Sequence, residues 1–194
     1  MKVSTGLKQL LTSQTRTKLI SIFFYQPSEM FYVRQLVRLT GEEINSVRRE
    51  LENLKKIFLL SSEVRGNRLF YWANPEHHFY YHLLVLAHLS QGLGRLLVEN
   101  KSKLGSIKAV LYSQEFLRNT TSGNVDILFI GDISLKNLEI LVKEAEAEIK
   151  TEINYMVMDK QELKLRRSRR DPIITEFFLN SPAMMIGDPI NLLK

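Results

Sequence analysis

The segment 31–72 restricts the possible folds of this chain most, because its pattern changes from helical to extended. A first helix is predicted over 33–39, and Thr40-Gly41-Glu42-Glu43 ends it and begins a second. Thr40 and Glu43 have the spacing of a capping box. Beyond Ile57, extended stretches follow over 59–64 and 69–72. The segment therefore predicts two helices joined by a tight turn and followed by a β-hairpin.

The second helix is predicted to have one apolar and one polar face. Its apolar residues recur at helical spacing: Ile44, Val47, Leu51 and Leu54. The opposite face is left to polar and basic residues: Asn45, Ser46, Arg48 and Arg49. Amide, hydroxyl and guanidinium groups bind base edges and phosphates. This face is therefore the first candidate for a binding surface.

The hairpin is predicted to have a basic tip. Gly66-Asn67 forms a two-residue loop of the type that favours a hairpin, and Arg65 and Arg68 flank it. A further helix is expected before the segment, with Ser13 as its N-cap and Pro27 after its end, and Leu7, Leu10 and Leu11 suggest a shorter one still earlier. Together these elements predict a winged helix-turn-helix. In this fold Arg65, Asn67 and Arg68 would meet phosphates or the minor groove, while the second helix meets the major groove.

Charge sets the first part of the chain apart. Residues 1–75 contain 12 Lys and Arg against 6 Asp and Glu, whereas residues 76–194 contain 15 of each, so the whole net charge of +6 lies in the first part. A basic excess alone is often only a solvated face. An excess on a module of this architecture favours a polyanionic partner.

Composition excludes several other classes of protein. The chain has no cysteine, so disulfides and thiolate metal sites are excluded. No apolar run approaches the roughly 20 residues that span a bilayer. The first residues do not have the pattern of a signal peptide, so we expect a cytoplasmic protein with no membrane partner.

The rest of the chain is predicted to form a helical connector and a second domain. Residues 79–100 are rich in leucine and predict one helix, or two that are broken near Gly92. These leucines could be core or could form a dimer seam. After residue 104 the pattern alternates between strand and helix. Strands are expected over 107–111, 125–130, 153–158 and 183–186, and helices over 135–150 and 160–179, the last interrupted by Pro172. The expected domains are 1–75, a connector over 76–104, and a small α/β domain over 105–194, an α+β protein as a whole.

Two parts of the sequence resemble known families. Phe31-Tyr32-Val33-Arg34-Gln35-Leu36, Leu39-Thr40-Gly41, Val47-Arg48-Arg49-Glu50-Leu51 and Gly66-Asn67-Arg68 resemble the winged helix-turn-helix regulators of the arsenic-repressor-like kind. The stretch Val125-Asp126-Ile127-Leu128-Phe129-Ile130-Gly131-Asp132 resembles the core strand of the nucleotidyltransferase-like domains fused to them.

The second resemblance implies a site that this chain has lost. Such transferases use a Gly-Ser pair to hold a phosphate and an Asp-x-Asp with a third carboxylate to hold metal ions. Here the Gly-Ser position reads Tyr112-Ser113, and the Asp-x-Asp position reads Asn124-Val125-Asp126. Near the expected third acid the chain offers Asn154 and Tyr155, with carboxylates only at the strand ends, Glu152 and Asp159. The resemblance therefore implies a degenerate site at Ser113, Asn124 and Asp126 and no catalysis.

Two other groups of residues have a functional and a structural interpretation. His78 and His82, four apart on an expected helix, could share a metal ion, but with no cysteine and one nearby carboxylate, Glu76, surface histidines are favoured. The basic run 164–170 could contact phosphates, although such runs more often form a solvated helix face.

The sequence therefore predicts a transcriptional regulator that is not an enzyme, uses no cofactor, and binds double-stranded DNA as a homodimer. The second domain could bind a nucleotide effector or a protein partner. One alternative is a minimal nucleotidyltransferase of the toxin-antitoxin type, with an autoregulatory DNA-binding domain. Another is a protein interaction module.

Overall fold

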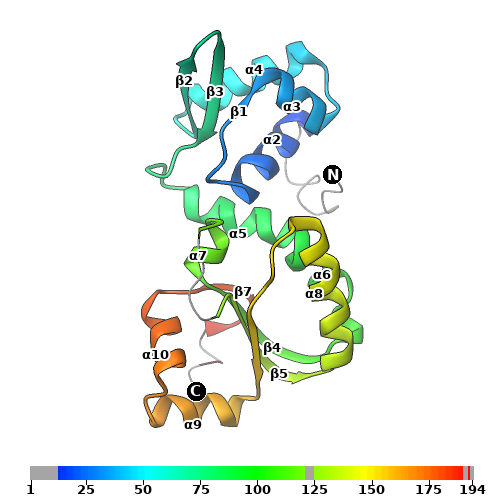
Figure 1. The fold of residues 1–194 in the computed structure, drawn as a ribbon, viewed down its shortest axis with the longest axis vertical. Coiled ribbons are helices and arrows are strands. Elements are labelled where there is room, and N and C mark those ends of the chain that lie inside the picture. The colour runs from blue at the N-terminus through cyan, green and yellow to red at the C-terminus, as the bar shows by residue number, and fades with distance from the viewer. Residues whose placement is uncertain (1–12, 121–124, 190–191, 193–194) are drawn as a thin grey trace. The chain divides into compact units, whose positions relative to one another are not determined.

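The computed structural model describes residues 13–120, 125–189 and 192, and the chain divides into two compact units, 1–91 and 92–194 (Figure 1). The expected short helix at the start of the chain lies outside the described residues. The boundary between the units falls inside the segment 76–104, which the sequence predicts as a helical connector. Each half of this segment belongs to one unit, and the units are described separately.

The N-terminal unit contains four helices and three strands among its described residues. In chain order they are α2 (Gln14–Tyr25), β1 (Phe31–Tyr32), α3 (Val33–Thr40), α4 (Ile44–Lys56), β2 (Leu60–Arg65), β3 (Arg68–Ala73) and α5 (Tyr80–Ser90). The strands form an antiparallel sheet in the order β1-β3-β2, with Arg65 paired to Arg68 across the predicted hairpin loop. Both predicted helices and the hairpin are therefore confirmed.

Local capping explains where these helices begin and end. The Ser13 hydroxyl accepts a hydrogen bond from the Arg16 N–H, as predicted for the N-cap of α2. Gly41 is left-handed, at φ 66°, and its N–H donates to the Val37 carbonyl, which ends α3. The predicted capping box is wrong, because Thr40 is the last residue of α3. Its hydroxyl donates to the Leu36 carbonyl, and Glu43 caps α4 without a side-chain bond.

The helix α5 completes the core of the N-terminal unit by packing against α2. The Phe24 and Tyr80 rings meet edge to face with centroids 5.8 Å apart. The Gln91 amide donates to the Ser21 carbonyl at 2.8 Å, and Leu84 is fully buried. Leu84 is therefore a core residue, whereas Leu86 on the same helix is exposed.

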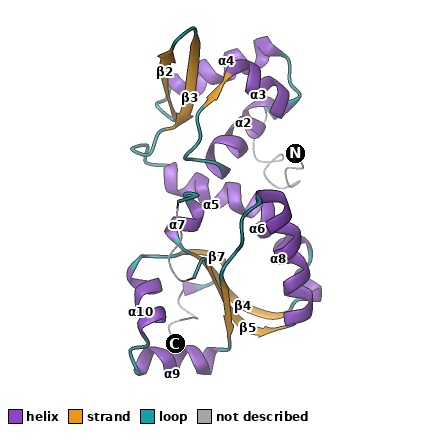
Figure 2. Cartoon of the chain, viewed as in Figure 1, coloured by secondary structure: helices purple, strands orange, loops and turns teal. Residues whose placement is uncertain are grey.

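The C-terminal unit is an α/β unit, as Figure 2 shows. Its helices are α6 (Gly92–Glu99), a 3-10 turn (Lys101–Lys103), α7 (Gln114–Leu117), α8 (Leu135–Ile149), α9 (Lys160–Ser168) and α10 (Pro172–Leu179). Its strands are β4 (Gly105–Tyr112), β5 (Ile127–Ile133), β6 (Tyr155–Met158) and β7 (Ala183–Gly187). They form one sheet in the order β6-β5-β4-β7, in which β5 and β6 are parallel and β4 is antiparallel to both neighbours.

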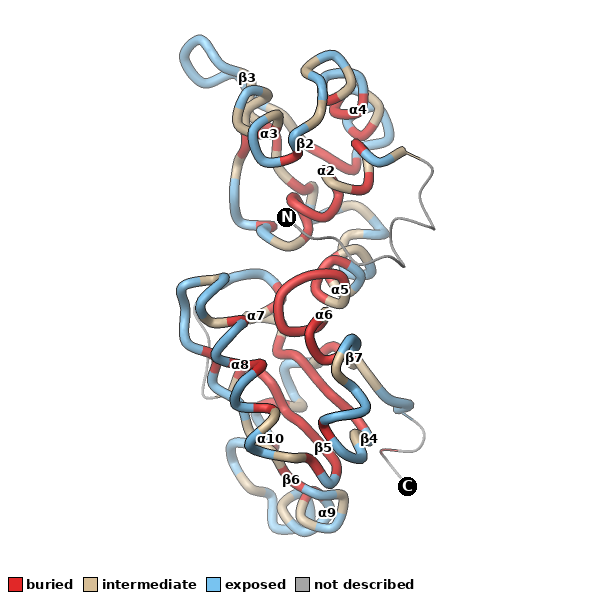
Figure 3. Tube along the Cα trace, turned by 90° about the vertical axis from the view of Figure 1, so that its right-hand side faces the viewer, coloured by how far each residue is buried: buried red, intermediate tan, exposed pale blue. Residues whose placement is uncertain are grey.

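The central strand β5 is buried along most of its length and β4 over its second half, because helices cover both faces of the sheet there (Figure 3). On one face, alternate residues of the strands meet α9 and α10 through Leu163, Ile174 and Phe177. On the other side lie α6 and α8 (Figure 1). In the described part of the chain, no helix is both long and apolar enough to cross a membrane.

Candidate nucleic-acid interface

The polar face of α4 is exposed as the sequence predicts. Asn45, Arg48 and Arg49 are exposed and Ser46 is half-buried. On the opposite face Val47, Leu51 and Leu54 are buried, at most 2 % exposed. Ile44 is only half-buried, so its prediction as a core residue is wrong. It is the first residue of α4.

Glu52 lies on the same helix as the two arginines, and its carboxylate is hydrogen-bonded to Tyr71. The Tyr71 hydroxyl donates to Glu52 Oε1 at 3.1 Å. Burial and the nearby Glu52 carboxylate raise the pKa of Tyr71 to about 12, so this hydroxyl stays protonated at neutral pH. Tyr71 is 3 % exposed, so its ring is packed inside the unit. Trp72 is half-buried.

Two ion pairs anchor α2 to the α3–α4 segment. Arg16 Nε lies 2.9 Å from Glu50 Oε2, and Ser13 also donates to this carboxylate. Lys18 pairs with Glu42 and donates to the Thr40 carbonyl at 2.8 Å. Glu50 is only 4 % exposed although its side chain is charged. These contacts join residues 34 and 24 positions apart and hold α4 in a fixed orientation.

Stability is expected to fall in acid because of Glu50. Burial alone would raise the pKa of Glu50, but hydrogen bonds from Arg16 and Ser13 outweigh it, so the pKa is lowered from 4.5. A lowered folded-state pKa contributes stability above about pH 4.5, and this contribution disappears as pH falls through the folded pKa. We expect Glu50→Gln to lower the free energy of unfolding by about 1–2 kcal/mol at pH 7.

Urea unfolding followed by the fluorescence of Trp72, the one tryptophan, measures this effect. The difference between the parent protein and Glu50→Gln should shrink below pH 4.5. Glu43→Gln, at an exposed position of the same segment, is the control and should change little. A difference that stays constant with pH would contradict the assignment.

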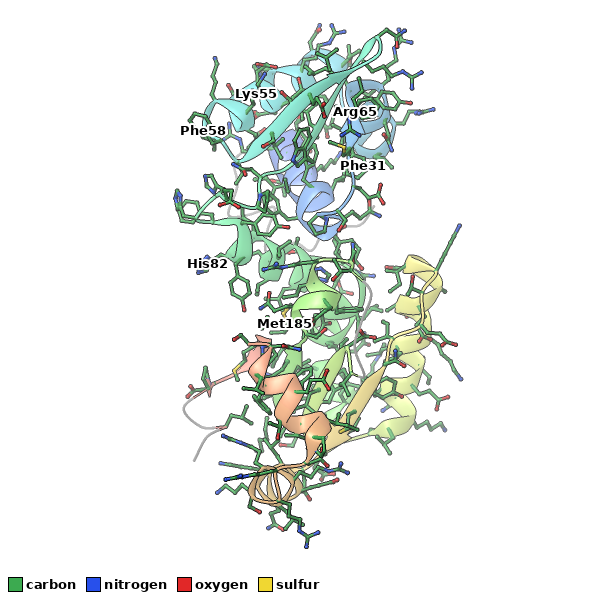
Figure 4. The ribbon with its side chains drawn as sticks, turned by 60° about the vertical axis from the view of Figure 1, so that its left-hand side comes forward. Phe31, Lys55, Phe58, Arg65, His82 and Met185 are labelled. Atoms are coloured by element: carbon green, nitrogen blue, oxygen red, sulfur yellow. The ribbon has the colours of Figure 1, made fainter. Side chains whose placement is uncertain are left out.

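The hairpin tip is a second basic surface. Gly66 adopts a φ of 61°, which suits the first position of a tight hairpin loop. Arg65, Asn67 and Arg68 are all exposed, and Arg65 forms an exposed ion pair of 3.0 Å with Glu63. Figure 4 shows Arg65 on the hairpin and Lys55 near the end of α4.

Arg68 packs on the ring of Tyr32 in β1, a residue that the sequence pattern did not mark as functional. The Arg68 guanidinium lies 4.7 Å from the centre of the Tyr32 ring, and Arg38 donates to the Tyr32 hydroxyl at 3.1 Å. Tyr32 in turn meets the Phe70 ring edge to face at 5.7 Å. The phenol thus orders one guanidinium from the hairpin and one from α3. The signal in the sequence was an aromatic residue directly before an arginine-rich helix.

Two residues of the degenerate site that the resemblance implies, Ser113 and Asp126, are described, and they lie side by side. The Ser113 N–H donates to the Asp126 carbonyl at 2.8 Å. Their side chains serve the fold, however. Ser113 caps α7 by accepting from the Phe116 N–H, and Asp126 Oδ2 accepts from the Asn154 N–H at 2.8 Å. Asp126 is 2 % exposed, and Asn124 lies outside the described residues.

The segment that was expected to supply a third acid meets Asp126 at Asn154. Asn154 meets Asp126 through its backbone, at the start of β6, whereas Asp159 follows the far end of that strand and caps α9. Glu152 is exposed in the preceding turn. In the ranges 13–120 and 125–189, no group of three His, Cys, Asp or Glu residues is placed to hold a metal ion.

The histidines do not share a helix as predicted. α5 begins at Tyr80, so His78 lies before it, and the expected spacing of two imidazoles on one helical face is wrong. His77 and His78 instead stack on each other with centroids 4.4 Å apart.

Comparison of the chain with protein-family models, with curated proteins and with solved structures found no match.

Proposed function

We propose that the N-terminal unit is a winged helix-turn-helix that reads duplex DNA, and that the chain is a transcriptional regulator. The observation that carries the proposal is the exposed polar face of α4, with Arg48 and Arg49 opposite a face on which Val47, Leu51 and Leu54 are buried. The order of helices and strands and the sheet order β1-β3-β2 support it. The charge of +6 on residues 1–75 supports a polyanionic partner.

In this proposal α4 enters the major groove. Arg48 and Arg49 present planar guanidinium groups of the kind that bind guanine through two hydrogen bonds, and Asn45 presents an amide suited to adenine. The hairpin and the end of α3 meet the sugar-phosphate backbone through Arg65, Arg68 and Arg38. Phosphate contacts then fix the register, and α4 supplies the sequence preference.

The proposal includes a homodimer, because one such module makes few base contacts and two modules read two half-sites. The leucine-rich segment 79–100 gives less support to a dimer interface than its sequence suggested. Leu84, Leu93, Leu96 and Leu97 are buried, whereas Leu86 is exposed. The C-terminal unit is proposed to be a noncatalytic partner of the DNA-binding unit that binds an effector or another protein.

The proposal is tested by fluorescence anisotropy with duplexes selected from a random pool and with scrambled duplexes, across a salt series. A DNA reader should prefer the selected duplex, and its affinity should fall steeply with salt. Equal and salt-independent affinity for both duplexes would favour the interaction module instead.

Substitution of Tyr32 should weaken binding without changing sequence preference. Tyr32→Phe removes the acceptor of Arg38 but keeps the ring beneath Arg68, whereas Tyr32→Leu removes both. Because a cation–π contact at an exposed site contributes about 0.5–1 kcal/mol, we expect the Leu variant to bind all duplexes roughly two- to fivefold more weakly. The Phe variant should lie between it and the parent. If both variants bind like the parent, Arg38 and Arg68 do not contact DNA.

A further inference from the structure

The end of α9 and the turn that follows carry dense positive charge. Lys164, Arg166, Arg167, Arg169 and Arg170 fall within residues 164–170, which contain no acidic residue. Arg166 is neutralised, at 2.7 Å from Glu162 and 3.2 Å from Asp171. Arg167, Arg169 and Arg170 are exposed, and they form no ion pair with any residue that the structure describes.

The helix dipole explains only part of this charge. Cations in the last turn of a helix are favourable, and Arg166 and Arg167 occupy that turn of α9. Arg169 and Arg170 lie beyond it, next to the N-terminus of α10, where the helix dipole disfavours cations. Asp171 caps α10 and is already shared with Arg166. The helix dipole therefore does not account for the charges of the two later arginines.

Two of these arginines line an open groove together with residues of α10. Arg167 and Arg170 face Thr175 and the end of the helix at Asn180, and Glu176 lies on the same lining. The Arg167 guanidinium lies 5.5 Å from the centre of the Phe178 ring, which restrains its orientation. The Arg170 N–H donates to the Arg167 carbonyl at 3.1 Å, so the tight turn fixes the two residues relative to each other.

We infer that this groove contacts the phosphate backbone of duplex DNA. Guanidinium groups match phosphate oxygens with two parallel hydrogen bonds, and the Thr175 hydroxyl and Asn180 amide add uncharged donors. The choice of DNA as the polyanion rests on the proposed function. An acidic protein segment is the competing occupant, and the test below separates the two.

The test compares the full chain with Arg167→Gln/Arg170→Gln by anisotropy on selected and scrambled duplexes across a salt series. The matched control is Lys101→Gln/Lys136→Gln, which removes the same charge from exposed positions of the same unit. Each phosphate contact contributes about 0.9 to the slope of log affinity against log salt, so the groove variant should lower that slope by about 1.8 for both duplexes. The control should retain the parent slope.

Equal slopes for the parent protein and the groove variant would overturn the inference, as would an equal loss in the lysine control. If polyglutamate binds the parent and not the groove variant while DNA binding is unchanged, the groove takes an acidic protein segment and the inference is wrong. The groove variant could lower the salt slope while the parent protein shows no preference between the duplexes. That result would support the inference and contradict sequence reading by α4. A parent that binds no duplex would overturn both.

Discussion

Replacement of Arg48 or Arg49 by alanine is expected to reduce the preference for the selected duplex over a scrambled one by roughly 5- to 150-fold. The physical reason is that a guanidinium bound to guanine through two hydrogen bonds discriminates by about 1–3 kcal/mol. The buried set on the opposite face of α4 leaves both arginines exposed. Anisotropy with both duplexes at several salt concentrations measures the ratio of affinities.

Arg49→Lys and Lys55→Ala are the matched controls for this prediction. The lysine variant keeps the charge but loses the planar fork, so it should lose sequence preference and keep its salt dependence. Lys55, in the last turn of α4, should affect both duplexes alike. Retention of the parent ratio in both arginine variants would show that α4 does not read bases.

The second large effect is expected at Gly131 in the C-terminal unit. Gly131 lies at an irregularity between β4 and β5, at φ 146°, and an added Cβ would lie 2.2 Å from the Ser106 carbonyl oxygen. Backbone strain and overpacking together should lower the free energy of unfolding of this unit by about 2–4 kcal/mol for Gly131→Ala. Hydrogen exchange of the β4 and β5 amides measures the loss.

Gly66→Ala is the control for Gly131→Ala. Gly66 is also left-handed, at φ 61°, but a Cβ there meets no atom within 4 Å. Its cost should be only about 1–2 kcal/mol, confined to the hairpin. Unchanged exchange in β4 and β5 of Gly131→Ala would mean that the two strands do not approach as closely as described.

Elements with a strong local signal could be predicted from the sequence. The apolar spacing of α4, the Gly66-Asn67 loop and the interruption at Pro172 all reappear in the structure, because each depends on neighbouring residues. The division near Gly92 has the same origin, since this residue begins α6 with a φ of 51°. These signals required no knowledge of the tertiary contacts.

Features that depend on distant residues could not be predicted. Glu50 is charged and would be expected on the surface. Its burial is explained by its pairing with Arg16, 34 residues away. The two-residue strand β1 is defined by its pairing with β3 and is too short for a periodic signal. For the same reason, the contact of Tyr32 with Arg68 follows from the register of β1 and β3.

The predicted binding residues show the same contrast. The exposed arginines of α4 and the hairpin follow from periodicity and loop type, and the structure places them as expected. Thr40 and Glu43 had the spacing of a capping box, yet the left-handed Gly41 ends α3 after Thr40 and removes it from the N-cap position. The short motif was insufficient to predict the N-cap of α4, because Thr40 could belong to the end of α3 or to the start of α4.

Selection of bound sequences from a random pool of duplexes, with the parent protein and the Arg48→Ala/Arg49→Ala variant side by side, tests the central proposal most directly. The parent should enrich one sequence, arranged as two half-sites if the protein is a dimer, and the variant should lose that enrichment while retaining salt-sensitive binding. A parent that enriches no sequence, or a variant that enriches the same one, would contradict the proposal that α4 reads DNA.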